Sequence, residues 1–271
     1  MKKILLALLL AAAGILYAEQ PLYSIPVLGD LHYDRADCHD MEWVTANMGK
    51  DLRQIRNYTG VTETNTPELF RQVEANAASR SEPVPFVIQM GDFTEGLCGS
   101  RELQGKLFRH ALDAVKGTFR RPFFLVRGNH DVTGPGSWEA GDDVLLPYLR
   151  ETLNDPRASY NYAVERGEDV FLFFEAMRPD LAWLKRELPK HSGKRHIFLY
   201  PHIGRSAHHR VLENAPQILC ALVLGQLCNV GSVNYYSAAV HRVNARYHIE
   251  HGRFSRAVSA YNGDKIAVVK G

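Results

Sequence analysis

The sequence predicts an α/β protein with a largely parallel central sheet. Short apolar runs alternate with amphipathic stretches, Gly residues end several of the apolar runs, and 45% of the residues are hydrophobic. Strands that alternate with helices are typical of a layered fold with a parallel core sheet. The chain has 271 residues and no Pro- or Ser-rich linker, so we expect one domain over residues 19–271.

The elements follow from the apolar pattern along the chain. Strands are predicted at 22–28, 85–90, 123–126, 170–174 and 197–200, and helices at 66–79, 102–116 and 181–188. The first helix begins with Thr66 as a capping residue and Pro67 in the first turn. Later strands are predicted close together, at 219–224, 238–243, 255–260 and 266–269, which indicates a second, more antiparallel sheet.

Residues 1–18 are typical of a signal peptide. Three residues with two lysines precede an apolar run over 4–16, and cleavage is expected after Ala18. Because a bilayer span takes about 20 residues, we expect an exported periplasmic or extracellular protein without stable membrane insertion; an uncleaved anchor helix is the alternative. The formal net charge of +2 gives no reason to expect a nucleic-acid partner.

Polar residues of metal-ligand type follow three of the predicted strands. Asp30 and His32 follow the first, Asp92 the second, and Asn129 and His130 the third, each just after a Gly. Ligands of open α/β sheets bind beyond the carboxyl ends of the strands, so these side chains should meet in one crevice. Mixed oxygen and nitrogen ligands favour Mn, Fe, Zn or Mg.

This set of residues indicates phosphate-ester hydrolysis. Asp30 and His32 can bind one ion, Asn129 can bind a second, and Asp92 has two oxygens with which to bridge them. Two such ions, about 3.5–4 Å apart, grip phosphate oxygens and lower the pKa of a bound water. His130 would then donate a proton to the leaving oxygen or a hydrogen bond to the transition state.

The elements Asp30-x-His32, Gly91-Asp92 and Gly128-Asn129-His130-Asp131 resemble those of the calcineurin-like metallophosphoesterase superfamily. The resemblance runs from about residue 24 to the last strands. It implies a four-layer sandwich of two mixed β-sheets flanked by helices. It also implies two divalent metal ions, with Asp30 and His32 on the first, Asp92 between them, Asn129 on the second, and His130 as the catalytic histidine.

Three further residues take expected roles from this resemblance. Glu95 falls where many members carry an acidic partner of the catalytic histidine, and it would orient the ring of His130; a solvated loop acid is the alternative. Asp131 is expected to brace its loop. His202, after the strand at 197–200, resembles a ligand of the second metal, although Ile203 replaces the usual Pro.

The last family element, Gly-His-x-His, is altered in this chain. Gln226 and Cys228 stand where the two histidines would be. Either these two residues bind metal, or His241, His248 or His251 substitutes for them, or one metal binds poorly. The last case gives the alternative function, a non-catalytic or impaired metal- or phosphate-binding protein on the same fold.

The remaining expectations concern cysteines and substrate. Four cysteines in an exported chain permit disulfides. Cys38 and Cys98 each lie a few residues past a suspected ligand loop, which favours that pair. The expected substrate is a small-molecule phosphate ester, and its specificity should lie in stretches 33–66 and 133–155, which carry no recognisable motif.

Overall fold

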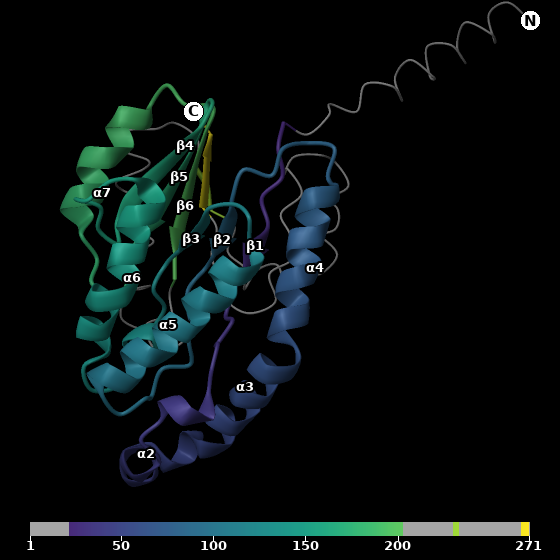
Figure 1. Cartoon of the computed structure of the whole chain (residues 1–271). Helices are drawn as coiled ribbons and strands as arrows, with labels where there is room; N and C mark the ends of the chain where they lie inside the picture. Colours follow the sequence, from purple (N-terminus) through teal and green to yellow (C-terminus); the bar gives the residue numbers. More distant parts are fainter. Residues whose placement is uncertain (1–21, 203–229, 233–266, 271) are drawn as a thin grey trace, which may run out of the picture.

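The computed structural model describes residues 22–202, 230–232 and 267–270, which form two β-sheets and six α-helices (Figure 1). In the first sheet, β1 (Val27–Leu28), β2 (Val87–Gln89) and β3 (Phe123–Leu125) lie in this order with parallel pairing. The second sheet has the order β4 (Tyr162–Arg166), β5 (Asp169–Phe174), β6 (His196–Pro201), β8 (Ala267–Lys270) and β7 (Val230–Ser232). Among these strands, β5 and β6 are parallel and the other neighbours antiparallel. The predicted α/β class and the contrast between the two sheets are confirmed.

The helices include several that the sequence pattern did not predict. They are α2 (Met41–Asn47), α3 (Leu52–Thr64), α4 (Thr66–Ser79), α5 (Arg101–Thr118), α6 (Ser137–Leu153) and α7 (Leu181–Glu187), with short 3-10 helices η1 (Ala36–Cys38), η2 (Gly49–Asp51), η3 (His130–Val132) and η4 (Leu188–His191). The helices α4, α5 and α7 match the predicted ones. The other three occupy the stretches without a motif. Two of them were hard to predict because α3 is mostly polar with Gly60 inside it and α6 contains Pro147.

Some predicted boundaries and elements were wrong. The strand expected at 22–28 pairs only over β1, and the expected capping Thr66 is already helical. Asn65 precedes α4 in a helical backbone conformation, because α3 ends directly before it. Strand β4 was not predicted; it forms an antiparallel hairpin with β5.

Aromatic side chains fill the space between the two sheets. The ring centroids of Phe124 on β3 and Phe173 on β5 lie 5.8 Å apart, and Tyr162 on β4 stacks on Phe173 at 4.5 Å. The Tyr162 hydroxyl donates to the Leu125 carbonyl at 2.8 Å and accepts from the Leu125 N–H at 3.1 Å. These contacts join β4 and β5 to β3, and thus hold the strand ends of the first sheet in place.

Side chains of β5 alternate between two hydrophobic clusters. Phe171 and Phe173 belong to the cluster shared with the first sheet, α5 and α6, whereas Val170 and Leu172 pack with Leu184 of α7. This alternation is the ordinary two-residue period of a strand. Figure 1 shows α7 beside the second sheet and α4 beside β1, on the opposite side of the molecule.

Arg127 and Glu175 form an ion pair in the interior, just after β3 and β5. Arg127 Nε lies 2.6 Å from a Glu175 carboxylate oxygen, and the two side chains are 5% and 3% exposed. The Arg127 guanidinium also lies 3.4 Å from the centroid of the Tyr160 ring. Removal of one partner from such a pair leaves a buried charge uncompensated.

We therefore expect Arg127→Met to lower the free energy of unfolding by about 3–5 kcal/mol. Urea unfolding followed by circular dichroism measures this change. The double variant Arg127→Met with Glu175→Leu should recover part of the loss, because no unpaired charge then remains in the interior. A loss below about 1 kcal/mol for the single variant, as for a surface pair, would contradict this account of the pair.

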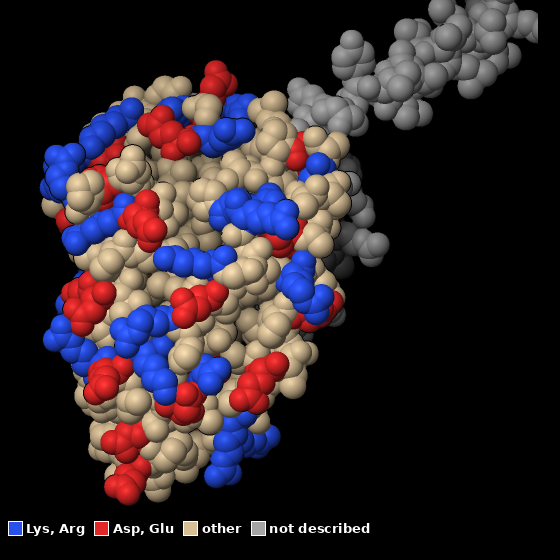
Figure 2. Space-filling view, viewed as in Figure 1, with Lys and Arg blue, Asp and Glu red and all other residues tan. Residues whose placement is uncertain are grey.

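Several predictions fall outside the described residues. They are the signal peptide at 1–18, the strands at 219–224, 238–243 and 255–260, and the stretch that contains Gln226 and Cys228. Within the described ranges, none of the helices is long and apolar enough to cross a bilayer. On the face shown in Figure 2, Lys and Arg are interspersed with Asp and Glu, in keeping with the nearly balanced charge.

Candidate metal centre

The loops that follow β1, β2 and β3 meet at one edge of the first sheet. Because the three strands are parallel, their carboxyl ends lie at the same edge. Backbone hydrogen bonds join the first two loops: His32 N–H donates to Asp92 O at 2.9 Å, and Tyr33 N–H donates to Phe93 O at 3.0 Å. The three loops that the sequence predicted to meet are therefore adjacent at this edge of the sheet.

The backbone of these loops is strained where ligand-type residues lie. Asp30, His32 and Asp92 have φ angles of 42°, 44° and 48°. The left-handed region costs a residue with a side chain roughly 1–2 kcal/mol, and such strain gathers at functional sites. Gly91, at φ 102°, makes the turn before Asp92 without this cost.

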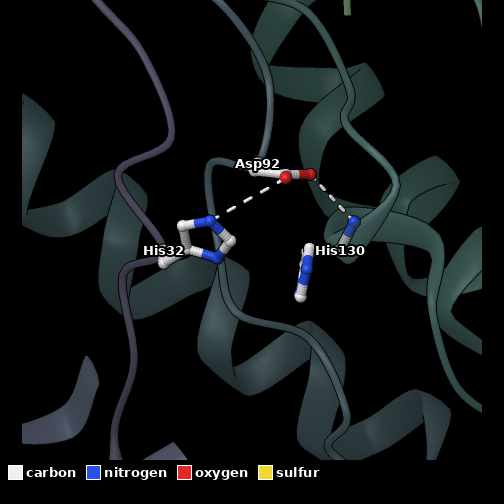
Figure 3. Close-up of side chains that lie close together, drawn as sticks. All are labelled: His32, Asp92 and His130. Carbon is white, nitrogen blue, oxygen red and sulfur yellow. Dashed lines mark hydrogen bonds and ion pairs between the residues drawn. The ribbon is translucent and has the colours of Figure 1, made fainter. Parts of the chain in front are cut away.

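Asp92 lies at the centre of the cluster. One of its carboxylate oxygens, Oδ2, lies 3.8 Å from His32 Nε2, and the other, Oδ1, accepts the backbone N–H of His130 at 2.9 Å (Figure 3). Oδ2 also lies 3.3 Å from His202 Nε2. Two groups of ligand atoms within 4.8 Å of one another share this residue. One is His32, Asp92 and His130, and the other is Asp30, Asp92 and His202.

Each of the three histidine rings is held through its Nδ1 atom. His202 Nδ1 lies 2.8 Å from the Met90 carbonyl, and His130 Nδ1 lies 2.9 Å from the Glu95 carbonyl. A carbonyl oxygen only accepts, so Nδ1 carries the proton in both rings. His32 Nδ1 lies 2.7 Å from the Glu95 carboxylate and donates in the same way. In the neutral rings, Nε2 of His32 and of His202, the atoms that face Asp92, carries the lone pair that a metal ion would take.

Asn129 provides an independent test of whether the site fits a cation. Its side-chain oxygen Oδ1 is buried and has no hydrogen-bond partner among the described residues. A buried amide oxygen without a partner costs about 1–3 kcal/mol, and a bound cation would satisfy it. The oxygen and nitrogen donors gathered here are of the kind that Mn, Fe, Zn and Mg accept.

The carboxylates experience opposing electrostatic effects in this cluster. Burial raises the pKa of Asp30, and the charge of Asp92 adds to the effect against the influence of His202 and His32. Burial also acts to raise the pKa of Asp92, but the hydrogen bond and charge of His202 and the proximity of His130 outweigh it, so its pKa lies below the usual value. Two neighbouring carboxylates turned toward the same space favour occupation by positive charge.

A comparison with known families agrees with this geometry. The sequence matches the calcineurin-like phosphoesterase family over residues 23–235. The chain belongs to this family. The membership implies a hydrolase acting on phosphoester bonds with divalent metal ions, and no curated protein matches the sequence.

Glu95 of this phosphoesterase-family chain lies between two histidines. Its side chain is fully buried, and Oε2 lies 2.7 Å from His32 Nδ1 and 3.4 Å from His130 Nδ1. The solvated-loop alternative for Glu95 is therefore wrong. The closer carboxylate contact is to His32, whereas His130 was the partner expected from the sequence; His130 Nδ1 is held by the carbonyl of Glu95.

Asp131 braces the loop, as the sequence predicted. It is buried, and its two carboxylate oxygens accept the backbone N–H groups of Phe93, Thr94 and Gly128 at 2.8–3.0 Å, as well as the Thr94 hydroxyl. The loops after β2 and β3 are thus joined through one side chain. Its carboxylate oxygens are occupied by these hydrogen bonds, so Asp131 supports the ligand loops and does not act as a ligand itself.

Gln89 is a supporting residue that sequence reasoning missed. Its side chain is fully buried, accepts the Gly91 N–H at 2.9 Å and donates to the Gly91 carbonyl at 2.5 Å. It therefore fixes the turn before Asp92. A signal was present, because a Gln inside an otherwise apolar strand must find a buried partner.

The expected disulfide between Cys38 and Cys98 is not formed. Both cysteines are buried free thiols, and Cys98 Sγ donates to the Gly96 carbonyl at 3.6 Å. Burial raises the pKa of Cys38 to about 11 and that of Cys98 further. These side chains are packed as small apolar groups. Cys38, Asp37 and His110 also form a third group of possible ligands, but the Asp37 carboxylate is already paired with Lys106 and Arg35.

The remaining predicted ligands cannot be placed in this cluster. Gln226 and Cys228 lie outside the described residues, as do the substitutes proposed for them, His241, His248 and His251. In the described part of the chain, the ligand atoms of Asp30, His32, Asp92, His130 and His202 lie together, and Asn129 directly precedes His130 on its loop. These six residues come from the loops after β1, β2 and β3 and from the end of β6.

Proposed function

We propose that this protein hydrolyses phosphate mono- or diesters at a centre of two divalent metal ions. The observation that carries the proposal is the sharing of Asp92 by two compact groups of ligand atoms. As in the family arrangement, one ion would be held by Asp30, His32 and Asp92, and the second by Asp92, Asn129 and His202. In the structure the ligand atoms of Asp30 lie with those of His202, and those of His32 lie with those of His130. Such ions, Mn, Fe, Zn or Mg, would polarise the phosphoryl oxygens and lower the pKa of an attacking water.

His130 is suited to act on the leaving group of the ester. Its side chain is 22% exposed, so a substrate can reach it, whereas the ring of His32 is 9% exposed. Nδ1 is committed to the Glu95 carbonyl, which turns Nε2 away from that backbone. When protonated, Nε2 can give its proton to the leaving oxygen, which is the step that general acid catalysis accelerates about 10²–10⁴-fold.

The proposed complete fold stacks the two sheets between two helical layers. Two observations support it: the aromatic contacts of Phe173 with the first sheet, and the packing of Leu172 against Leu184 on the opposite side of β5. A crystal structure of the whole chain tests the arrangement, and a second sheet with one solvent-exposed face would contradict it.

Removal of metal tests the proposed activity. We expect the purified protein to hydrolyse an aryl phosphate or a bis-aryl phosphate in the presence of Mn²⁺ or Zn²⁺, and to lose this activity in a chelator. Restoring the metal should restore the rate, because the ligands themselves are unchanged. Release of the coloured phenolate measures turnover.

The non-catalytic alternative makes a different prediction for the same preparations. A metal- or phosphate-binding protein would bind the ion or phosphate in calorimetry and show no turnover with any of the four metals. Activity that persists in the chelator, at a rate equal to that with metal, would contradict the metal-dependent mechanism.

A further inference from the structure

Helix α3 contacts the metal centre from a stretch of the chain that carries no recognisable motif. Gln54 and Tyr58 lie one helical turn apart, on the same face of α3. Gln54 contacts Glu95, and Tyr58 contacts His32. Neither α3 residue contacts the ligand atoms of Asp30 or Asp92 through a hydrogen bond or ion pair in the described structure. Gln54 contacts the carboxylate that holds His32, and Tyr58 contacts the face of the His32 ring.

Gln54 determines the orientation of the Glu95 carboxylate. Its amide Nε2 donates to Glu95 Oε1 at 2.8 Å, while the other carboxylate oxygen accepts from His32 Nδ1 at 2.7 Å. Because Glu95 is fully buried, water cannot take the place of Gln54 without a rearrangement. The Gln54 amide thus keeps Glu95 Oε2 directed at His32. The hydrogen bond between Oε2 and His32 Nδ1 in turn keeps the His32 proton on Nδ1.

Tyr58 limits the movement of the His32 ring. The two rings are stacked, with centroids 4.3 Å apart and planes 9° from parallel. The His32 ring also meets the His130 ring, with centroids 4.6 Å apart and planes at 80°. The imidazole therefore contacts two rings, and its rotation is restricted before any ion binds.

The helix itself is fastened to the loop that carries His32. Thr59 donates its hydroxyl to the Asp34 carboxylate at 3.0 Å, and Asp34 N–H donates to the Thr62 hydroxyl at 2.8 Å. Asp34 is also paired with His39 at 2.7 Å in the interior. Because these bonds join α3 to a position two residues after His32, helix and ligand loop form one supporting unit.

We propose that Gln54 and Tyr58 are positioning residues that preorganise His32 for metal binding. They hold the Glu95 carboxylate and the His32 ring so that Nε2 faces Asp92 in the absence of the ion. This inference rests on the proposed metal centre. Its consequence is that α3 sets the affinity of the ion bound by His32, although α3 supplies no ligand to it.

Metal titration of the full chain tests this role. Calorimetry with Mn²⁺ should show binding weaker by about tenfold or more in Gln54→Leu and in Gln54→Met, in the range found when support behind a metal ligand is lost. Tyr58→Leu should weaken binding as well, and Tyr58→Phe should restore it to near the wild-type value, because the stacked ring is retained. Arg56→Gln, on an exposed position of the same helix, is the matched control and should bind as the wild type does.

A second readout does not depend on metal. Nitrogen-15 spectra of the histidines in the metal-free protein should show His32 as a single Nδ1-protonated form in the wild type and as a mixture of tautomers in Gln54→Leu, with His32→Gln used to assign the signal. Wild-type affinity and an unchanged tautomer in both Gln54 variants would overturn the positioning role alone. No binding of Mn²⁺ or Zn²⁺ by the wild type would overturn the metal centre, and the positioning role with it.

Discussion

Asp92→Asn is expected to reduce phosphoesterase activity by roughly a thousandfold or more, which corresponds to about 4 kcal/mol of transition-state stabilisation. Asp92 belongs to both groups of candidate ligands, so one substitution affects both ions. The loss of its charge also leaves Asp30 as the single carboxylate in these two groups. No other single change among the described ligands removes a donor from both groups.

The direction in which the new amide points follows from the structure. Asp92 Oδ1 accepts the backbone N–H of His130 at 2.9 Å, and the side-chain oxygen of the introduced Asn can keep this bond. The amide nitrogen must then occupy the place of Oδ2, which lies 3.3 Å from His202 Nε2. Its N–H groups would point into the space where the ions are expected, and a donor there repels a cation.

The measurement is the turnover of an aryl phosphate with saturating Mn²⁺, together with the number of ions bound in calorimetry. Asp113→Asn is the matched control: it makes the same chemical change on an exposed position of α5 and should leave both quantities unaltered. Circular dichroism checks that the variant is folded. Wild-type turnover in a folded Asp92→Asn variant would refute the assignment of Asp92 as the shared ligand.

Gly91→Ala is expected to lower the free energy of unfolding by about 2–5 kcal/mol and activity by at least about a hundredfold. A Cβ atom at this position would lie 2.2 Å from Cγ and 2.4 Å from Cβ of His202. These atoms are at the base of the side chain, so a rotation of the ring does not relieve the overlap. The φ angle of 102° adds backbone strain for any residue with a Cβ.

The loss of activity has a specific cause in this case. His202 must move away, which breaks its bond to the Met90 carbonyl and withdraws Nε2 from Asp92. A control is Gly117→Ala in α5, where nothing lies within 4 Å of the added Cβ; it should be neutral or stabilising by up to about 1 kcal/mol. Thermal unfolding and turnover of both variants separate the two effects. Equal behaviour of the two variants would mean that His202 is not packed on Gly91.

The local sequence carried enough information to predict the ligand loops. An apolar strand, a Gly and a polar residue in succession describe a strand that ends at a turn, and parallel strands bring such turns to one edge of a sheet. Asp30, His32, Asp92, Asn129 and His130 could therefore be placed together from their positions along the chain. His202 required the resemblance to a family, since its strand belongs to the other sheet.

The supporting contacts could not be predicted in the same way. Gln54 and Glu95 are 41 residues apart, and the sequence of α3 does not indicate which loop Gln54 would contact. The family resemblance paired Glu95 with His130, but the structure places its carboxylate closer to His32. Such choices depend on which side chains share a buried space after the elements have packed, and spacing along the chain does not report that.

The sequence by itself determined the class of fold, the order of the ligand loops and the residue types that can hold a cation. Only the tertiary structure decided which groups support the ligand loops. Gln89 holds the turn at Gly91, Asp131 joins two loops, and α3 packs against His32. The physical reason is the range of each effect. Strand ends and turns are set by neighbours in the chain, whereas a buried polar group takes the partner that packing brings within hydrogen-bond distance.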